Sequence, residues 1–106
     1  MNRLRELTPT QVHARLREGS AILVDVREHD EHAAERIAGA LHAPLSSFDP
    51  RTLPDAGDKA VILHCAGGKR SAMAVERCLA AGIPVDTHLG GGIGAWKAAG
   101  LPIERG

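Results

Sequence analysis

Short apolar runs alternate with longer polar or amphipathic segments along most of the chain. Two of these runs, Ala21 to Val26 and Ala60 to His64, are rich in β-branched residues and almost wholly apolar. This pattern is typical of strands that are covered on both faces. Two weaker runs, Ala40 to Ala43 and Val85 to Leu89, predict further strands.

Helix signals fall between the predicted strands. Thr10 to Glu18 has Pro9 at its first turn and Gly19 after its last, the usual punctuation of a helix. We also expect helices over residues 28–35, 71–81 and 94–99, and an irregular stretch with one helical turn over 44–54. This alternation predicts an α/β fold with a mainly parallel sheet and helices on both faces. Functional sites in such sheets gather beyond the carboxyl ends of the strands.

The length and composition limit the classes of protein to consider. The 106 residues predict one domain, residues 1–106, because a second core would not fit. One Phe, one Trp and no Tyr leave no aromatic platform for bases, and thirteen basic residues balance thirteen acidic ones. We therefore expect no nucleic-acid partner and no membrane partner, so any preference for anions must be local.

Cysteine usage and the start of the chain predict a compartment. The two cysteines, Cys65 and Cys78, are too few for a disulfide framework, which favours a reducing environment. Residues 1–6 are charged and lack the apolar run of a secretory signal, and no apolar stretch approaches the length of a membrane span. The sequence therefore predicts a soluble, cytoplasmic protein.

The candidate chemistry lies in the segment that follows the 60–64 strand. This segment consists of Cys65, Ala66, Gly67, Gly68, Lys69, Arg70 and Ser71. The two glycines let the backbone turn tightly, so that successive N–H groups form a nest for an anion, and the next helix adds its positive end. Because such surroundings lower the pKa of a thiol, Cys65 is the candidate nucleophile.

Simpler interpretations stay open for the same residues. A free cysteine at a strand end is often a small buried apolar residue, and Lys69 and Arg70 are also typical of a solvated loop. His64 is a candidate base for Cys65, although adjacent strand residues point to opposite faces. Cys78 lies in an apolar part of the next helix, and we expect it to pack in the core.

Four segments of the chain resemble motifs of one family, in the family's order. Residues 23–28 contain an Asp-x-Arg after a strand, and residues 37–40 form an Ile-x-Gly-Ala turn. Residues 65–71 are similar to an active loop, and residues 89–102 contain Gly-Gly-x-x-x-Trp followed by Gly-Leu-Pro. The chain resembles a single-domain rhodanese over nearly its whole length. The resemblance implies a three-layer α/β/α fold with about five strands.

The resemblance also implies an activity, thiosulfate sulfurtransferase. Cys65 would attack a small anionic sulfur donor and keep one sulfur as a persulfide, which cyanide or a thiol, including a protein thiol, then removes. The residues from Ala66 through Gly67 and Gly68 to Ser71 would supply the backbone cradle, with Arg70 closing it and Lys69 attracting the donor. The family's reaction requires no cofactor, and we expect none.

Two positions depart from the family's pattern. Arg36 stands where the family often has His before the Ile, and Ala66 follows the nucleophile where a polar or basic residue is common. The first difference falls in a structural turn. Ala66 removes a side chain that could have touched the donor, so the resemblance does not identify the donor.

Two other functions are compatible with such a loop. Cysteine phosphatases and arsenate reductases place Arg six positions after the Cys, whereas Arg70 is five after Cys65 and Ser71 holds the sixth position. The shorter loop favours a single sulfur over a phosphate. A rhodanese-like module kept for binding or regulation is the second alternative, because a fold does not guarantee an activity.

The remaining polar and aromatic candidates have structural explanations. His29 and His32 could share a helix face as metal ligands, but no third ligand is apparent and we propose no metal. Asp25 and Arg27 end a strand, where they could border the pocket, although we favour ion pairs and hydrogen bonds that brace loops. Trp96 is expected to pack, and residues 90–92 to make a tight turn.

Overall fold

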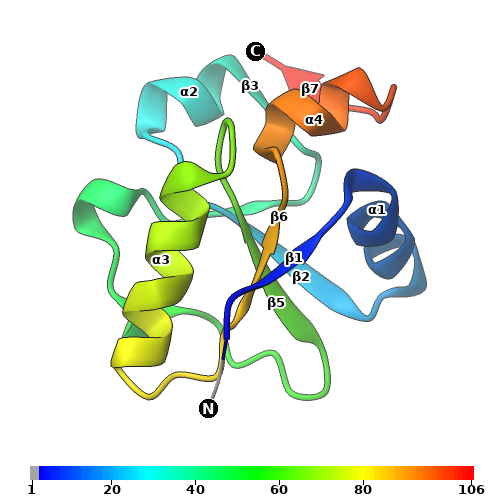
Figure 1. Cartoon of the computed structure of the whole chain (residues 1–106). Coiled ribbons are helices and arrows are strands. Elements are labelled where there is room, and N and C mark those ends of the chain that lie inside the picture. Colours follow the sequence, from blue (N-terminus) through cyan, green and yellow to red (C-terminus); the bar gives the residue numbers. More distant parts are fainter. Residues whose placement is uncertain (1–2) are drawn as a thin grey trace.

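The computed structural model describes residues 3–106 (Figure 1). Its main sheet has five parallel strands in the order β1-β6-β5-β2-β4. These strands are β1 (Arg5–Leu7), β2 (Ala21–Asp25), β4 (Leu41–His42), β5 (Ala60–His64) and β6 (Thr87–Leu89). A separate antiparallel ribbon joins β3 (Glu35–Arg36) to β7 (Glu104–Arg105). The main sheet confirms the predicted parallel α/β architecture.

Helices cover both faces of this sheet. They are α1 (Pro9–Glu18), α2 (His29–Ala34), α3 (Lys69–Ala80) and α4 (Gly92–Ala98), and two 3₁₀ turns cover Leu45–Ser47 and Pro50–Thr52. Figure 1 shows α3 and α1 on opposite sides of the strands, as a three-layer α/β/α fold requires. None of the helices within residues 3–106 combines the length and apolar character needed to cross a bilayer.

Two apolar clusters, one on each side of the sheet, hold the layers together. Consecutive residues of β5 belong to different clusters, because Ile62 packs with Trp96 of α4 and Leu63 packs with Cys78 of α3. Cys78 and Trp96 are 0% and 1% exposed, which confirms that both are packing residues. Cys65 lies two residues after Leu63 and belongs to the α3 cluster.

The structure differs from the sequence prediction mainly at short or edge elements. β1 was not predicted, because its three residues are largely exposed and two of them are charged. β6 begins at Thr87 rather than Val85, where parallel pairing with β1 and β5 starts. α3 begins at Lys69 and α4 at Gly92, each two residues earlier than expected.

Candidate active site

Cys65 directly follows β5 at the carboxyl end of the sheet. The loop that begins with it lies at the top of Figure 1, near α2 and the start of α4. Only 1% of the Cys65 surface is exposed, so its sulfur is surrounded by protein groups. Those groups decide whether this cysteine is a packing residue or a nucleophile.

Backbone and hydroxyl groups of the loop converge on the Cys65 sulfur. The Gly68 N–H donates a hydrogen bond to Cys65 Sγ at 3.0 Å, and Ser71 Oγ lies 3.5 Å from the same atom. Gly68 has φ +106° and is the N-cap of α3, so the positive end of a twelve-residue helix faces the sulfur. Of the residues in the predicted cradle, 66–71, Gly68 and Ser71 contact the sulfur directly.

The two buried thiols have opposite pKa shifts. Burial raises the pKa of Cys65, but hydrogen bonds from the Ser71 hydroxyl and from the backbone of Ser71, Gly68 and Gly67 outweigh it and lower the pKa below its ordinary value. Burial alone raises the pKa of Cys78 to about 11. The difference comes from the donors around Cys65, and it makes Cys65 the better nucleophile of the two.

The first turn of α4 fixes the orientation of the loop that begins with Cys65. The Ile93 N–H donates to the Cys65 carbonyl at 2.9 Å, and the Gly94 N–H donates to the Ala66 carbonyl at 3.0 Å. These contacts require glycine at position 92, where an added Cβ would lie 2.3 Å from the Cys65 carbonyl oxygen. The backbone there also has φ +59°, which side chains rarely tolerate. The predicted tight turn at residues 90–92 therefore also supports the site.

Arg70 forms a bidentate ion pair with Glu31 of α2. Its Nη1 and Nη2 donate to the two Glu31 carboxylate oxygens at 2.6 and 2.9 Å. The Arg70 guanidinium lowers the pKa of Glu31 to about 2, and the Glu31 carboxylate raises the pKa of Arg70. The sequence did not single out Glu31, because this residue lies in a polar helix and nothing distinguishes it from its acidic neighbours. Arg70 thus ties the loop to α2.

The other loop residues lie on the outer side of the cradle. Ala66 is half-buried, while Gly67 and Lys69 are exposed. Lys69 is the first residue of α3. Its position at the start of this helix places a positive charge at the outer edge of the loop.

Asp25 and Arg27 form a buried ion pair away from the sulfur. Arg27 Nη2 lies 2.8 Å from Asp25 Oδ2 and also donates to the Glu35 carbonyl at 2.6 Å. His32 Nδ1 lies 2.8 Å from the same Asp25 oxygen. Hydrogen bonds to the Asp25 carboxylate outweigh the effect of its burial and hold its pKa below the ordinary value. This network confirms the bracing role that the sequence suggested.

His64 belongs to that network and does not face the Cys65 sulfur. Its Nε2 lies 3.9 Å from Asp25 Oδ1, and its Nδ1 contacts the Cys65 carbonyl oxygen at 3.3 Å. Burial lowers the pKa of His64. The candidate base for Cys65 that the sequence suggested is therefore directed to the other face of the sheet.

His88 contacts the active loop, although sequence analysis did not single it out. Its Nδ1 lies 2.7 Å from Ser71 Oγ, and its Nε2 lies 3.2 Å from Glu6 Oε2. His88 is only 2% exposed. The sequence signal was a histidine near the carboxyl end of a predicted strand. The structure shows that this strand, β6, lies next to β5, which leads into the Cys65 loop.

Histidines elsewhere do not gather into a metal site. His32 stacks on His42 with their ring centroids 4.3 Å apart, while its Nδ1 contacts Asp25. Within residues 3–106, no three His, Cys, Asp or Glu side chains are arranged to hold a metal ion.

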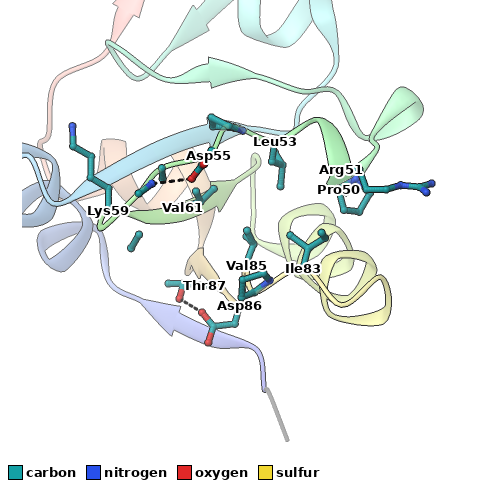
Figure 2. A pocket seen from close by; sticks show the side chains of 15 residues that line it. Pro50, Arg51, Leu53, Asp55, Lys59, Val61, Ile83, Val85, Asp86 and Thr87 are labelled. Carbon is teal, nitrogen blue, oxygen red and sulfur yellow. Dashed lines mark hydrogen bonds between the residues drawn. The ribbon is translucent and has the colours of Figure 1, made fainter.

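A hollow of about 370 Å³ lies at the opposite end of the sheet (Figure 2). The loops before β5 and β6 and the first residues of these two strands form it, with Leu53, Val61, Ile83 and Val85 as its apolar lining. The side chain of Lys59 extends outward from its edge (Figure 2). Because Cys65 follows the far end of β5, this hollow is separate from the Cys65 sulfur.

Comparison with known proteins assigns the chain to a family. The sequence model of the Rhodanese-like domain matches residues 8–99. The chain belongs to the rhodanese-like domain family. The matched range of this rhodanese-like domain includes the loop of residues 65–71 and the glycine turn before α4.

Curated relatives of this rhodanese-like domain carry different names. The uncharacterized protein slr1261 of Synechocystis is 40% identical over 93% of this chain and 55% of its own length. The HTH-type transcriptional regulator Rv0324 of Mycobacterium tuberculosis is 32% identical over 94% of the chain and 45% of its length. A sulfurtransferase of Allochromatium vinosum is 35% identical over 77% of both chains. The rhodanese-like domain spans about half the length of the first two relatives.

A solved structure shows the same fold. The thiosulfate sulfurtransferase of Pseudomonas aeruginosa is 30% identical, with a TM-score of 0.80, over 97% of this rhodanese-like domain and 20% of that chain. The comparison therefore concerns one domain of a longer enzyme.

Proposed function

We propose that this domain is a sulfurtransferase that carries a sulfane sulfur on Cys65 as a persulfide. One observation carries the proposal: the Gly68 N–H donates to the buried Cys65 sulfur, the Ser71 hydroxyl contacts it, and hydrogen bonding lowers the pKa of Cys65, whereas the equally buried Cys78 has a raised pKa. A packing cysteine needs no such donors. An anionic sulfur, either thiolate or persulfide, does need them.

The first half of the reaction loads the sulfur. The Cys65 thiolate attacks the outer sulfur of thiosulfate, the bond between the two thiosulfate sulfurs breaks, and sulfite leaves with the electron pair. The product is a Cys65 persulfide whose terminal sulfur is anionic. The Gly68 N–H and the positive end of α3 stabilise this charge, and the exposed Lys69 attracts the doubly negative donor.

The second half of the reaction transfers the sulfur to an acceptor. The carbon of cyanide, or the sulfur of a thiolate, attacks the terminal sulfur and releases the Cys65 thiolate. A protein thiol is an equally suitable acceptor by this chemistry. The proposed partners are thus a small anionic sulfur donor and a thiophilic acceptor, in a reducing compartment such as the cytoplasm.

Thiocyanate formation from thiosulfate and cyanide tests this proposal directly. Cys65→Ala removes the nucleophile, so thiocyanate production should fall to the uncatalysed background. Cys78→Ala removes the second buried thiol from the same layer and should keep most of the activity, which makes it the matched control.

Two outcomes would overturn the proposal. Equal loss of activity in the two variants would show that Cys65 has no special role. Cys65-dependent hydrolysis of an aryl phosphate, without thiocyanate formation, would mean that the loop transfers phosphoryl groups instead.

A further inference from the structure

We propose that His88 accepts the Cys65 proton through the Ser71 hydroxyl, and that Glu6 stabilises the resulting imidazolium. The inference rests on the proposed function, because it explains how the nucleophile of that function loses its proton. It assigns a role in catalysis to a strand residue outside the loop, and positioning roles to Ser71 and Glu6.

Strand register places Glu6 and His88 side by side. Glu6 of β1 is the direct partner of His88 in β6, and Leu63 of β5 is the partner on the other side. Partners in adjacent parallel strands point to the same face of the sheet, here the α3 face that also holds Leu63 and Cys65. The first turn of α3 brings Ser71 to that face. Glu6, His88, Ser71 and Cys65 therefore meet, although they come from β1, β6, α3 and the loop after β5.

The Ser71 hydroxyl has one proton and three neighbouring acceptors. Ser71 Oγ lies 2.7 Å from His88 Nδ1, 3.2 Å from the Gly68 carbonyl oxygen and 3.5 Å from Cys65 Sγ. The contact with His88 is the shortest. The Gly68 carbonyl already accepts from the Ala72 N–H at 3.2 Å, so it does not depend on Ser71. In the resting state the Ser71 proton therefore points to His88, and Ser71 Oγ accepts from the Cys65 thiol.

Two coordinated proton shifts then produce the thiolate. The Cys65 proton moves from Sγ to Ser71 Oγ, and the proton already on Ser71 Oγ moves to His88 Nδ1. The result is a Cys65 thiolate that accepts a hydrogen bond from Ser71, and a His88 imidazolium. No other reactant is needed, because the number of protons in the network does not change.

Glu6 is placed to offset the positive charge on His88. Its Oε2 lies 3.2 Å from His88 Nε2, but out of line for a well-directed hydrogen bond, and His88 Nε2 has no hydrogen-bond partner among the described residues. The Glu6 side chain fits there because position 90 is glycine, where an added Cβ would lie 2.6 Å from Glu6 Cγ. Burial lowers the pKa of His88 and Glu6 acts in the opposite direction, so the ring is neutral at rest and Glu6 favours its protonation.

The pH dependence of Cys65 alkylation by iodoacetamide tests this network without any sulfur donor. His88→Gln keeps a hydrogen-bonding side chain but cannot take the proton, so the apparent pKa of Cys65 should rise by about one unit. Alkylation at pH 7 should then slow about tenfold and return to the native rate at high pH, where the thiolate forms without help. Glu6→Gln, at a side chain that is 67% exposed, should shift the profile in the same direction by a smaller amount.

Matched variants separate this role from a general loss of structure. Glu76→Gln removes an exposed carboxylate from α3 and should leave the profile unchanged. Combining His88→Gln with Ser71→Ala should shift the pKa no further than Ser71→Ala alone, because both variants break the same path. A profile of His88→Gln that superimposes on the native one would overturn the proposal.

Titration of the His88 ring by NMR gives a reciprocal measurement. The thiolate and the imidazolium stabilise each other, so Cys65→Ala should lower the pKa of His88. An unchanged His88 titration would contradict coupling between the two groups. The shifted alkylation profile of His88→Gln and the lowered His88 pKa of Cys65→Ala could both be observed in a protein that transfers no sulfur. That outcome would refute the proposed function but support the proton path.

Discussion

At the scale of single residues, hydrogen bonding distinguishes the surroundings of Cys65 from those of Cys78. Cys65 and Cys78 are 1% and 0% exposed, so burial does not distinguish them. The Gly68 N–H donates to the first sulfur and the Ser71 hydroxyl contacts it, whereas burial alone raises the pKa of the second. The sequence could predict this contrast, because Cys65 is followed by two glycines and the start of a helix, whereas Cys78 lies inside that helix.

The ion pair between Glu31 and Arg70 predicts a specific loss of stability in acid. The folded protein lowers the pKa of Glu31 from its ordinary 4.5 to about 2, so the pair stabilises the fold fully above about pH 4.5. That contribution disappears as the pH falls from 4.5 towards 2. Urea unfolding at pH 6 and pH 3 should show a smaller acid loss in Glu31→Gln than in the native protein.

An exposed carboxylate provides the control for this measurement. Glu18→Gln removes a similar charge from the exposed end of α1 and should leave the acid loss unchanged. The same acid loss in the native protein and in Glu31→Gln would show that the pair does not link the loop to α2.

At the scale of elements, the turn before α4 holds the loop in its working orientation. The amides of Ile93 and Gly94 bind the carbonyls of Cys65 and Ala66. With these two carbonyls bound by α4, the Gly68 N–H that follows them is directed at the sulfur. The sequence predicted a tight turn at residues 90–92 but not this contact, because two segments far apart in the chain must meet to form it.

Gly92→Ala should destabilise the domain more than a matched glycine substitution. Gly92 and Gly57 have φ +59° and +60°, so alanine at either position has the same backbone strain, about 1–2 kcal/mol. An added Cβ at Gly92 would also meet the Cys65 carbonyl oxygen, whereas at Gly57 nothing lies within 4 Å. Denaturant midpoints should therefore fall further for Gly92→Ala, and Cys65 alkylation should change in that variant alone. Equal midpoints for the two variants would show that the turn does not clamp the loop.

At the scale of the whole molecule, the fold was predictable and the complete site was not. The strong apolar runs of β2 and β5 predicted a parallel sheet, and the glycine loop after β5 indicated a candidate nucleophile. β1 is three residues long, with two charged and exposed residues, so no apolar pattern marked it. The pairing of β1 with β6 is nevertheless what brings Glu6 to His88. Proximity of this kind depends on strand order, which the local pattern of residues does not specify.

The central claim is that Cys65 carries a sulfur atom, and intact-protein mass after incubation with thiosulfate tests it most directly. We predict that the native protein and Cys78→Ala gain the mass of one sulfur atom, that a thiol reductant removes it, and that Cys65→Ala gains nothing. This measurement needs no knowledge of the natural acceptor. No gain in the native protein, or the same gain in Cys65→Ala, would contradict the account.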